Sequence, residues 1–93
     1  MSEQPYTIEF DTSAFKAFEK FARAEQSKLA QAIAALAIDP RPAGCVKMSG
    51  GQGWRIRVGD YRIVYVIDDT VRIVTITRVA HRREVYTKKG RGK

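Results

Sequence analysis

The spacing of apolar residues changes once along this chain, close to Gly53. Before that point, large apolar side chains recur every three or four residues, which is the period of an α-helix with one buried face. After it, apolar and polar residues alternate, which is the period of a β-strand. The pattern therefore predicts helices in the first half of the chain and strands in the second.

The first half opens with a predicted short strand over Tyr6–Phe10, in which every second residue is apolar. Oxygen-bearing side chains from Asp11 onward can cap a helix that follows. The segment Arg23–Gln26 is predicted to be a joint before a second, alanine-rich helix, which ends at Asp39–Pro42 because proline lacks an amide donor. The core-facing helical residues are predicted to be Phe15, Phe18, Phe21, Leu29, Ile33 and Leu36.

The second half begins after a glycine-rich loop over Ala43–Gly53. The stretch Tyr61–Ile67 is apolar or aromatic except for Arg62, which is the composition of a central strand. Short turns at Gly59 and at Asp68 separate it from its neighbours. The predicted strands are Trp54–Val58, Tyr61–Ile67, Val71–Val79 and a short last strand over Glu84–Tyr86.

Helices followed by closely connected strands predict an α+β domain. We expect an antiparallel sheet of about four strands, with the N-terminal strand and a two-helix hairpin packed on one face and the other face free. The pattern does not show where the N-terminal strand joins the sheet. One domain is predicted over residues 1–86, followed by a basic, disordered tail over residues 87–93. Residues expected to be buried beneath the sheet are Phe15, Phe18, Leu29, Ile33 and Leu36.

Charge is distributed unevenly between the two halves. Residues 1–53 carry six basic and six acidic side chains, whereas residues 54–93 carry eleven basic and four acidic ones. A surplus confined to the strand-forming half indicates a polyanionic partner, either nucleic acid or an acidic protein. The single cysteine, Cys45, cannot form an internal disulfide, and no apolar run is long enough to span a membrane. These features favour the reducing cytoplasm.

Basic residues should gather where the later strands begin and end. In a meander, the start of one strand and the end of the next lie at the same sheet edge, which brings Arg62 close to Arg78 and the His81–Arg83 run. Guanidinium groups bind phosphate oxygens in bidentate fashion. The alternative for any single arginine is a solvated surface charge, which is the ordinary case. Clustering with few acids nearby favours a phosphate-binding surface for the set as a whole.

Two segments resemble the motifs of RelE-type toxins. The run from Trp54 to Tyr65, reading WRIRVGDYRIVY, resembles their central motif, and Val79–Tyr86, reading VAHRREVY, resembles their closing motif. The likeness extends over about residues 6–86 and includes the order of strand, two helices and strands. It implies a metal-independent endoribonuclease without a cofactor, which enters the ribosomal A site and cuts the exposed codon of messenger RNA.

The resemblance also implies roles for single residues and for partners. Arg62 would hold the scissile phosphate, and Tyr86 would orient the nucleotide. It implies an acidic, RelB-like antitoxin, and contact with operator DNA only through the toxin–antitoxin complex. The implied catalytic residues are Arg57, Arg62, His81, Arg83 and Tyr86, and the implied RNA-binding residues are Lys47, Arg55, Arg78 and Arg82.

One departure from the family changes the expected chemistry. The basic pair before the glycine turn often includes a lysine, but here both members are arginine, at positions 55 and 57. Arginine cannot serve as a general base because it does not lose its proton in proteins. The proton of the attacking 2′-hydroxyl would therefore go to His81 or to Tyr86. Two other readings stay open: a ParE-like toxin that inhibits DNA gyrase, and an inactive nucleic-acid-binding relative.

Overall fold

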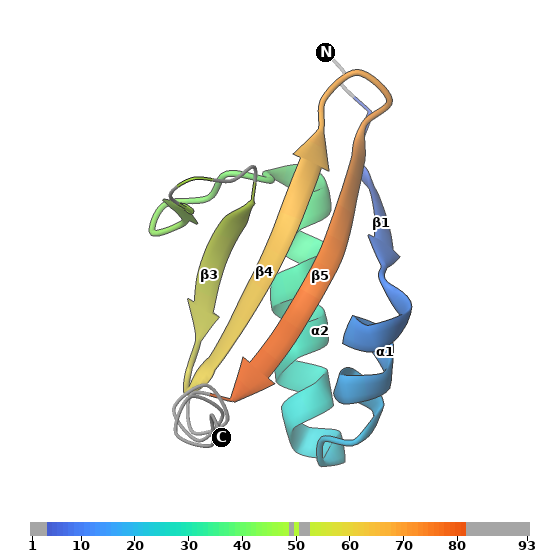
Figure 1. Ribbon diagram of the computed structural model, residues 1–93, viewed down its shortest axis with the longest axis vertical. Coiled ribbons are helices and arrows are strands. Elements are labelled where there is room, and N and C mark those ends of the chain that lie inside the picture. The colour runs from blue at the N-terminus through green and yellow to red at the C-terminus, as the bar shows by residue number, and fades with distance from the viewer. Residues whose placement is uncertain (1–3, 49, 51–52, 82–93) are drawn as a thin grey trace.

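The chain folds into one sheet with a two-helix layer on one of its faces (Figure 1). The structure is a computed structural model that describes residues 4–48, 50 and 53–81. Neither helix within these ranges has the length and apolarity needed to cross a membrane. In chain order the elements are β1 (Thr7–Phe10), α1 (Thr12–Glu19), α2 (Arg23–Ile38), β2 (Val46–Lys47), β3 (Trp54–Val58), β4 (Tyr61–Asp68) and β5 (Ile73–His81).

The strands lie in the order β1-β5-β4-β3-β2, so β4 is central as predicted. β3, β4 and β5 form the expected antiparallel meander. β1 joins beside β5 and runs parallel to it, with Phe10 opposite Ile76, so the sheet is mixed and not purely antiparallel. The chain reverses direction four times between β1 and β5, which leaves the two strands pointing the same way (Figure 1). β2 is a further difference, a two-residue strand inside the predicted loop.

The last strand contains one extra residue. Val64 of β4 pairs with Arg78, and the next residue of β4 pairs with Ile76, so Thr77 forms a β-bulge. The Thr77 hydroxyl donates to the carbonyl oxygen of Val64 at 3.2 Å. Because side chains alternate between faces, one extra residue reverses the alternation beyond it. Arg78 therefore faces away from the helices, and Val79 enters the core with an exposed fraction of 2%.

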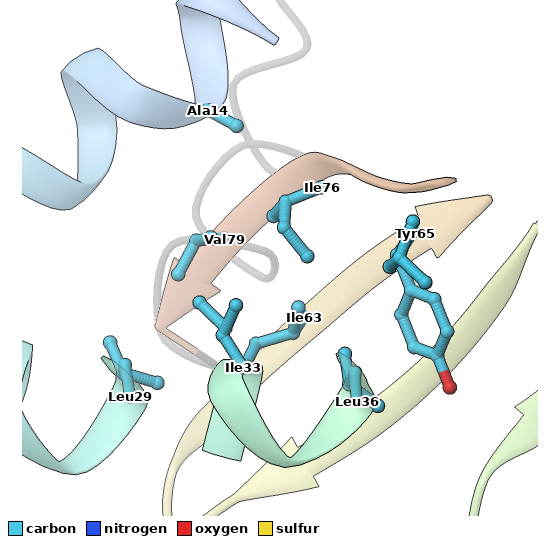
Figure 2. Packing of buried hydrophobic residues seen from close by; sticks show 9 residues of the cluster. Ala14, Leu29, Ile33, Leu36, Ile63, Tyr65, Ile76 and Val79 are labelled. Atoms are coloured by element: carbon cyan, nitrogen blue, oxygen red, sulfur yellow. The ribbon is translucent and has the colours of Figure 1, made fainter. Parts of the chain in front are cut away.

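The core lies between α2 and one face of the sheet (Figure 2). Leu29, Ile33 and Leu36 of α2 are at most 4% exposed, which confirms their predicted burial. Each such side chain contributes about 1.5–3 kcal/mol by leaving water. The sheet residues that complete this core are Ile63, Tyr65, Val74, Ile76 and Val79.

The joint between the helices differs from the prediction. α2 already begins at Arg23, so the expected irregular segment Arg23–Gln26 is helical instead. The Gln26 side-chain amide donates to the carbonyl oxygens of Phe18 and Glu19, at 3.0 and 3.1 Å. The last carbonyl groups of a helix lack hydrogen-bond donors within the helix, and the Gln26 amide is the donor for two of them at the end of α1. A polar residue that looked like part of a linker is therefore a cap for the preceding helix.

The predicted burial of Phe15 is wrong, because its side chain is 45% exposed. α1 lies beside the sheet margin, where Ala14 is the helix residue that enters the core. Phe15 instead packs on the outside against Phe10 and Phe18, with ring centroids 5.7 and 6.5 Å apart. Phe18 is partly buried against the core. Helical spacing therefore identified the apolar side of α1 but not how deeply each residue on it is buried.

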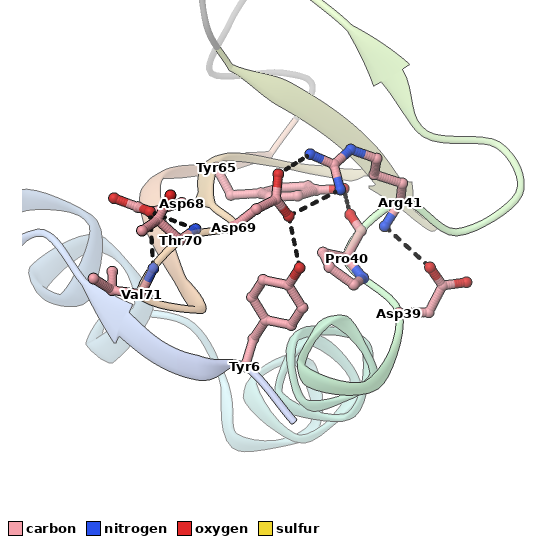
Figure 3. Close-up of polar contacts among 9 residues, drawn as sticks. All are labelled: Tyr6, Asp39, Pro40, Arg41, Tyr65, Asp68, Asp69, Thr70 and Val71. Carbon is pink, nitrogen blue, oxygen red and sulfur yellow. Dashed lines mark hydrogen bonds and ion pairs between the residues drawn. The ribbon is translucent and has the colours of Figure 1, made fainter. Parts of the chain in front are cut away.

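Polar contacts hold together the end of the sheet that carries the β4–β5 turn (Figure 3). Asp69 accepts a hydrogen bond from the Tyr6 hydroxyl at 2.6 Å and forms an ion pair with Arg41 at 2.9 Å. We call these three residues the Asp69 cluster. The Arg41 guanidinium, and after it the Tyr6 hydroxyl, lowers the pKa of Asp69, and the hydrogen bond to Asp69 raises the pKa of Tyr6. Three segments distant in sequence are joined there.

Candidate nucleic-acid interface

Four arginines share the sheet face that α2 does not cover, here called the open face. β3, β4 and β5 place them in two neighbouring rows. One row runs from Arg55 through Val64 to Arg78, and the other from Arg57 through Arg62 to Ala80. Successive rows along a strand are about 6.6 Å apart, and directly paired side chains about 5 Å apart. The four guanidinium groups therefore belong to one continuous surface.

Arg57 and Arg62 lie directly opposite one another on adjacent strands. Like charges in that position destabilise a sheet unless an opposite charge lies near them. Within the described part of the chain, no carboxylate forms an ion pair with any of the four arginines. The strands' own acidic residues on this face, Glu9 and Asp68, belong to rows at the far end of the sheet. The arrangement is suited to an anion supplied from outside.

Two of the predicted site residues do not lie on the open face. Lys47 pairs with Trp54, whose side chain packs toward the core, and the Lys47 ammonium lies 5.5 Å from the centre of the Trp54 ring. His81 pairs with Tyr61, and their rings meet edge to face with centroids 5.0 Å apart. Phe21 contacts the same Tyr61 ring at 4.9 Å. The Thr77 bulge places His81 on the core side, because it shifts every later residue of β5 to the opposite face.

The remaining predicted residues, Arg82, Arg83 and Tyr86, lie outside the described residues, as do the predicted strand over Glu84–Tyr86 and the tail over residues 87–93. His81 is the last described residue, and it ends β5 at the same edge of the sheet as Arg62. The chain therefore leaves the sheet beside the arginine rows.

One basic residue near this edge was not predicted from the sequence. Lys28 of α2 reaches the β3–β4 turn, where its ammonium lies 3.9 Å from the place that a side chain on Gly59 would take. Gly59 has a φ of +61°, a conformation that side chains disfavour. In the sequence Lys28 is an ordinary exposed helix residue, paired with Glu25 at 3.7 Å. Only the long-range packing of α2 places it beside the β3–β4 turn.

Metal-binding residues are not grouped in this part of the chain. Among residues 4–48, 50 and 53–81, no cluster of three histidine, cysteine, aspartate or glutamate side chains is placed to hold a metal ion. The ligands that the open face offers are guanidinium groups, which bind anions.

The chain matches one protein family over nearly its whole length. The sequence profile described as ParE toxin of type II toxin-antitoxin system, parDE, aligns with residues 8–86. This chain belongs to the RelE/ParE superfamily of type II toxins. No curated protein sequence matches it significantly. The family span includes both arginine rows and all the site residues predicted from the sequence.

Solved RelE structures share the fold of this toxin. The RelBE2 toxin–antitoxin complex of Mycobacterium tuberculosis has a chain 28% identical, with a TM-score of 0.75, covering 86% of this chain and 94% of that one. The isolated E. coli RelE toxin is 25% identical, with a TM-score of 0.73 and coverage of 92% and 96%. A chain of the RelE–RelB complex of Pyrococcus horikoshii OT3 is 21% identical, with a TM-score of 0.75 and coverage of 84% and 96%. The predicted RelE-like α+β fold is confirmed.

Proposed function

We propose that this toxin is an endoribonuclease that cuts messenger RNA in the A site of the ribosome and so inhibits translation. The observation that supports this function is the opposed pair Arg57 and Arg62, flanked by Arg55 and lacking any carboxylate partner in the described residues. RNA supplies the missing negative charge as phosphate. The similarity to RelE toxins, two of them at 25% identity or above, agrees with an RNA substrate.

The reaction assigned to this surface is transfer of a phosphodiester to the neighbouring ribose. The 2′-hydroxyl loses its proton and attacks the adjacent phosphorus, while the bond from phosphorus to the 5′-oxygen breaks and that oxygen takes up a proton. The products are a 2′,3′-cyclic phosphate and a free 5′-hydroxyl. Arg57 and Arg62 stabilise the negative charge that gathers on the phosphate oxygens in the transition state. The scheme assigns no step to a metal ion or a cofactor.

The ribosome has a defined part in this scheme. The ionisable residues in the two rows of the open face are all arginines, which do not accept a proton. Holding the codon in the reactive geometry is an orientation effect that can lower a barrier by several kcal/mol. We therefore expect cleavage of messenger RNA on programmed ribosomes and little cleavage of free RNA. Fast cutting of naked RNA at equal concentration contradicts this expectation.

The general base is assigned to His81 or Tyr86, and a pH profile separates the two. The His81 ring packs against Tyr61 on the core side of the sheet. A nucleotide on the open face can therefore contact this ring only by extending past the end of β5. If His81 carries the proton, His81→Gln lowers the single-turnover rate and changes its dependence on pH. If the variant keeps the wild-type rate and pH profile, the base is Tyr86. Tyr86→Phe then loses proton transfer and keeps stacking.

An antitoxin is the proposed protein partner. At least five similar structures are complexes of a RelE toxin with a RelB antitoxin or a peptide of it, from bacteria and from archaea. For this toxin we expect an acidic, RelB-like antitoxin that covers the arginine rows, acts in the cytoplasm beside the ribosome, and brings the pair to operator DNA. Charge attraction should speed association and weaken with salt. An association rate unchanged between low and high salt contradicts this electrostatic account.

Gyrase inhibition is the second candidate function, because the matching family profile carries the name of the ParE toxin. One experiment separates the candidates: the purified chain is added to a translating extract while mRNA ends are mapped, and to a gyrase supercoiling reaction in parallel. New mRNA ends within codons support the endonuclease, whereas blocked supercoiling without such ends supports the ParE-like activity. Arg62→Ala tests the site, and Arg23→Ala, an exposed arginine of the helix layer, is the charge-matched control.

A further inference from the structure

A pocket separates α1 from the second half of β5. Ser13, Ala14 and Ala17 of α1 and residues Thr77–Ala80 of β5 line a cavity of about 250 Å³, here called the side pocket. β1 pairs with β5 only as far as Phe10 and Ile76, and beyond that point α1 takes the place of the strand (Figure 1). A helix is about 10 Å wide, whereas paired strands lie about 4.8 Å apart, so a helix with small side chains leaves a gap there.

The lining of the side pocket combines buried apolar residues with residues that carry hydroxyl groups. Ala14, Val79 and Ala80 are at most 4% exposed. Ser13 and Thr77 carry hydroxyl groups, and the Thr77 hydroxyl donates its proton to the Val64 carbonyl oxygen, so it can only accept a further hydrogen bond. The volume lies below the roughly 300 Å³ at which pockets begin to hold drug-sized ligands. A single heterocyclic ring with a few polar edge atoms is of the right size and chemistry.

Arg78 connects the side pocket with the open face. It lines the pocket and also ends the row that begins with Arg55 on β3. An RNA backbone that crosses the sheet from the pair Arg57 and Arg62 toward β5 reaches Arg78 next. The base attached there lies within reach of the pocket, so one nucleotide can place its phosphate on the guanidinium and its ring beside the alanines.

We propose that the side pocket binds the unstacked base of a nucleotide next to the cleaved phosphodiester, with Arg78 holding that nucleotide's phosphate. The proposal rests on the proposed function in taking the ligand to be RNA, and it adds a second binding position outside the arginine pair. Proteins that read single-stranded RNA take bases out of the stack and hydrogen-bond their edges. Among the residues that line the pocket, the Ser13 hydroxyl can donate or accept such a bond, and the Thr77 hydroxyl can accept one.

Binding of nucleoside 5′-monophosphates to the purified chain tests the pocket without the ribosome. The probes are the four nucleotides, ribose 5-phosphate and inorganic phosphate, and the readout is a titration of backbone amide chemical shifts. We expect at least one nucleotide to bind more tightly than ribose 5-phosphate, with shifts at Ala14, Ala17 and Thr77. Equal affinity of the nucleotides and ribose 5-phosphate overturns the proposal, because the base then contributes nothing.

Filling the pocket supplies the matched variants. Ala17→Leu should weaken nucleotide binding by about tenfold or more, the scale on which an extra methylene group misfits a pocket, while leaving phosphate binding unchanged. Ala17→Ser, which adds little volume, is the control, and Ala17→Met is the second filling variant if leucine lowers the melting temperature. Arg78→Gln should weaken all three probe classes. Unchanged nucleotide affinity in both filling variants overturns the proposal.

Cleavage on ribosomes separates this inference from the proposed function. If the wild-type chain cuts no RNA but Ala17→Leu still abolishes the preference for nucleotides, the pocket is supported and the endonuclease assignment fails. If the wild-type chain cuts RNA and Ala17→Leu cuts the same positions at the same rate, the pocket is not used by the substrate and the inference fails. A capped acidic tetrapeptide that binds the wild-type chain and not Ala17→Leu, with nucleotide affinity unchanged, assigns the pocket to a protein partner and overturns the proposal.

Discussion

Charged side chains are paired at one end of this sheet and opposed to like charges at the other. At the β4–β5 turn, Asp69 is bound by both Arg41 and Tyr6, and the guanidinium of Arg72 lies over the Tyr6 ring at 4.3 Å. At the β3–β4 turn, Arg57 opposes Arg62, and neither forms an ion pair with a carboxylate of the described residues. Matched charges at the first end fix segments of the fold in place. The unmatched charges at the second end are available to a ligand.

This comparison predicts which end can lose an arginine without losing function. Arg62→Ala should reduce single-turnover cleavage on programmed ribosomes by about 10²–10³, the usual effect of removing one preorganised donor to a transition state. Arg57→Ala should behave similarly, and Arg55→Ala less severely. The free energy of unfolding of Arg57→Ala and Arg62→Ala should be unchanged or slightly higher, because each variant removes the opposition of like charges.

Arg41→Ala at the other end is the matched change, and it should leave the cleavage rate unaltered. Single-turnover rates and thermal unfolding of all four variants make the measurement. If Arg41→Ala reduces cleavage as strongly as Arg62→Ala, the division of roles between the two ends is incorrect.

A second prediction concerns stability at the matched end. The Tyr65 hydroxyl donates to the buried carbonyl of Pro40 at 2.8 Å, so Tyr65→Phe leaves that oxygen without a partner and should cost about 1–3 kcal/mol. Burial, and after it the nearby Cys45, raises the pKa of Tyr65 above its ordinary value. The unfolded chain therefore releases this proton first, and the free energy of unfolding falls as the pH rises above about 10.

Urea unfolding between pH 8 and pH 11 measures both effects. The alkaline decrease should be shallower in Tyr65→Phe than in the wild-type chain. Tyr6→Phe is the control for an exposed phenol, whose pKa is also raised, by its hydrogen bond to Asp69. An equally steep decrease in Tyr65→Phe shows that ionisation of Tyr65 is not responsible.

The unmatched end should determine how RNA binding depends on salt. For single strands, each neutralised phosphate contributes about 0.7 to the slope of log affinity against log salt concentration. Replacing Arg55 or Arg78 by glutamine should therefore lower the slope by about 0.7, as should replacing Arg57 or Arg62. Arg23→Gln should leave it unchanged. Fluorescence anisotropy with a short single-stranded RNA at several salt concentrations gives the slopes, and an equal slope in all variants places the phosphates elsewhere.

The smallest effect is expected at Asp69. Its carboxylate is exposed, so screening by water limits what the ion pair with Arg41 contributes. The contacts with Arg41 and Tyr6 lower its pKa, so this contribution is present above the ordinary aspartate range and is lost as the pH falls through the lowered value. Asp69→Asn should flatten the acid limb of stability slightly and leave cleavage unchanged. An unfolding curve from pH 2 to pH 6 checks the first expectation, and reduced cleavage would contradict the second.

Local periodicity explains how much of the fold the sequence predicts. The spacing of Leu29, Ile33 and Leu36 identified the buried side of α2 correctly, because those residues meet the sheet along one stripe. Phe15 has the same spacing but lies on a helix at the sheet margin, where depth depends on tertiary position. The parallel pairing of β1 with β5 joins segments more than sixty residues apart, which no local pattern shows.

In the candidate site too, the sequence predicted what depends on local alternation and not what depends on long-range pairing. Alternation within β3 placed Arg55 and Arg57 on one face, as the structure has them. β5 continues as a regular strand to His81, two residues beyond the predicted end at Val79, so Arg78 and His81 lie on opposite faces and do not converge. The extra residue Thr77 decides which face each of them takes. The side pocket left no trace in the sequence, because it exists only where α1 replaces a strand beside β5.

The position of β5 has a consequence for how the protein is made. β5 is the last described strand to be synthesised, yet it lies between β1 and β4 in the sheet. Ribosomes release the N-terminal segments first, so β1 has no neighbour to pair with until residues 73–76 have emerged. Until then β1 remains outside the sheet, and Arg78 is not in line with Arg55. The open face, with all four arginines in its two rows, is therefore complete only after the last described strand has been synthesised.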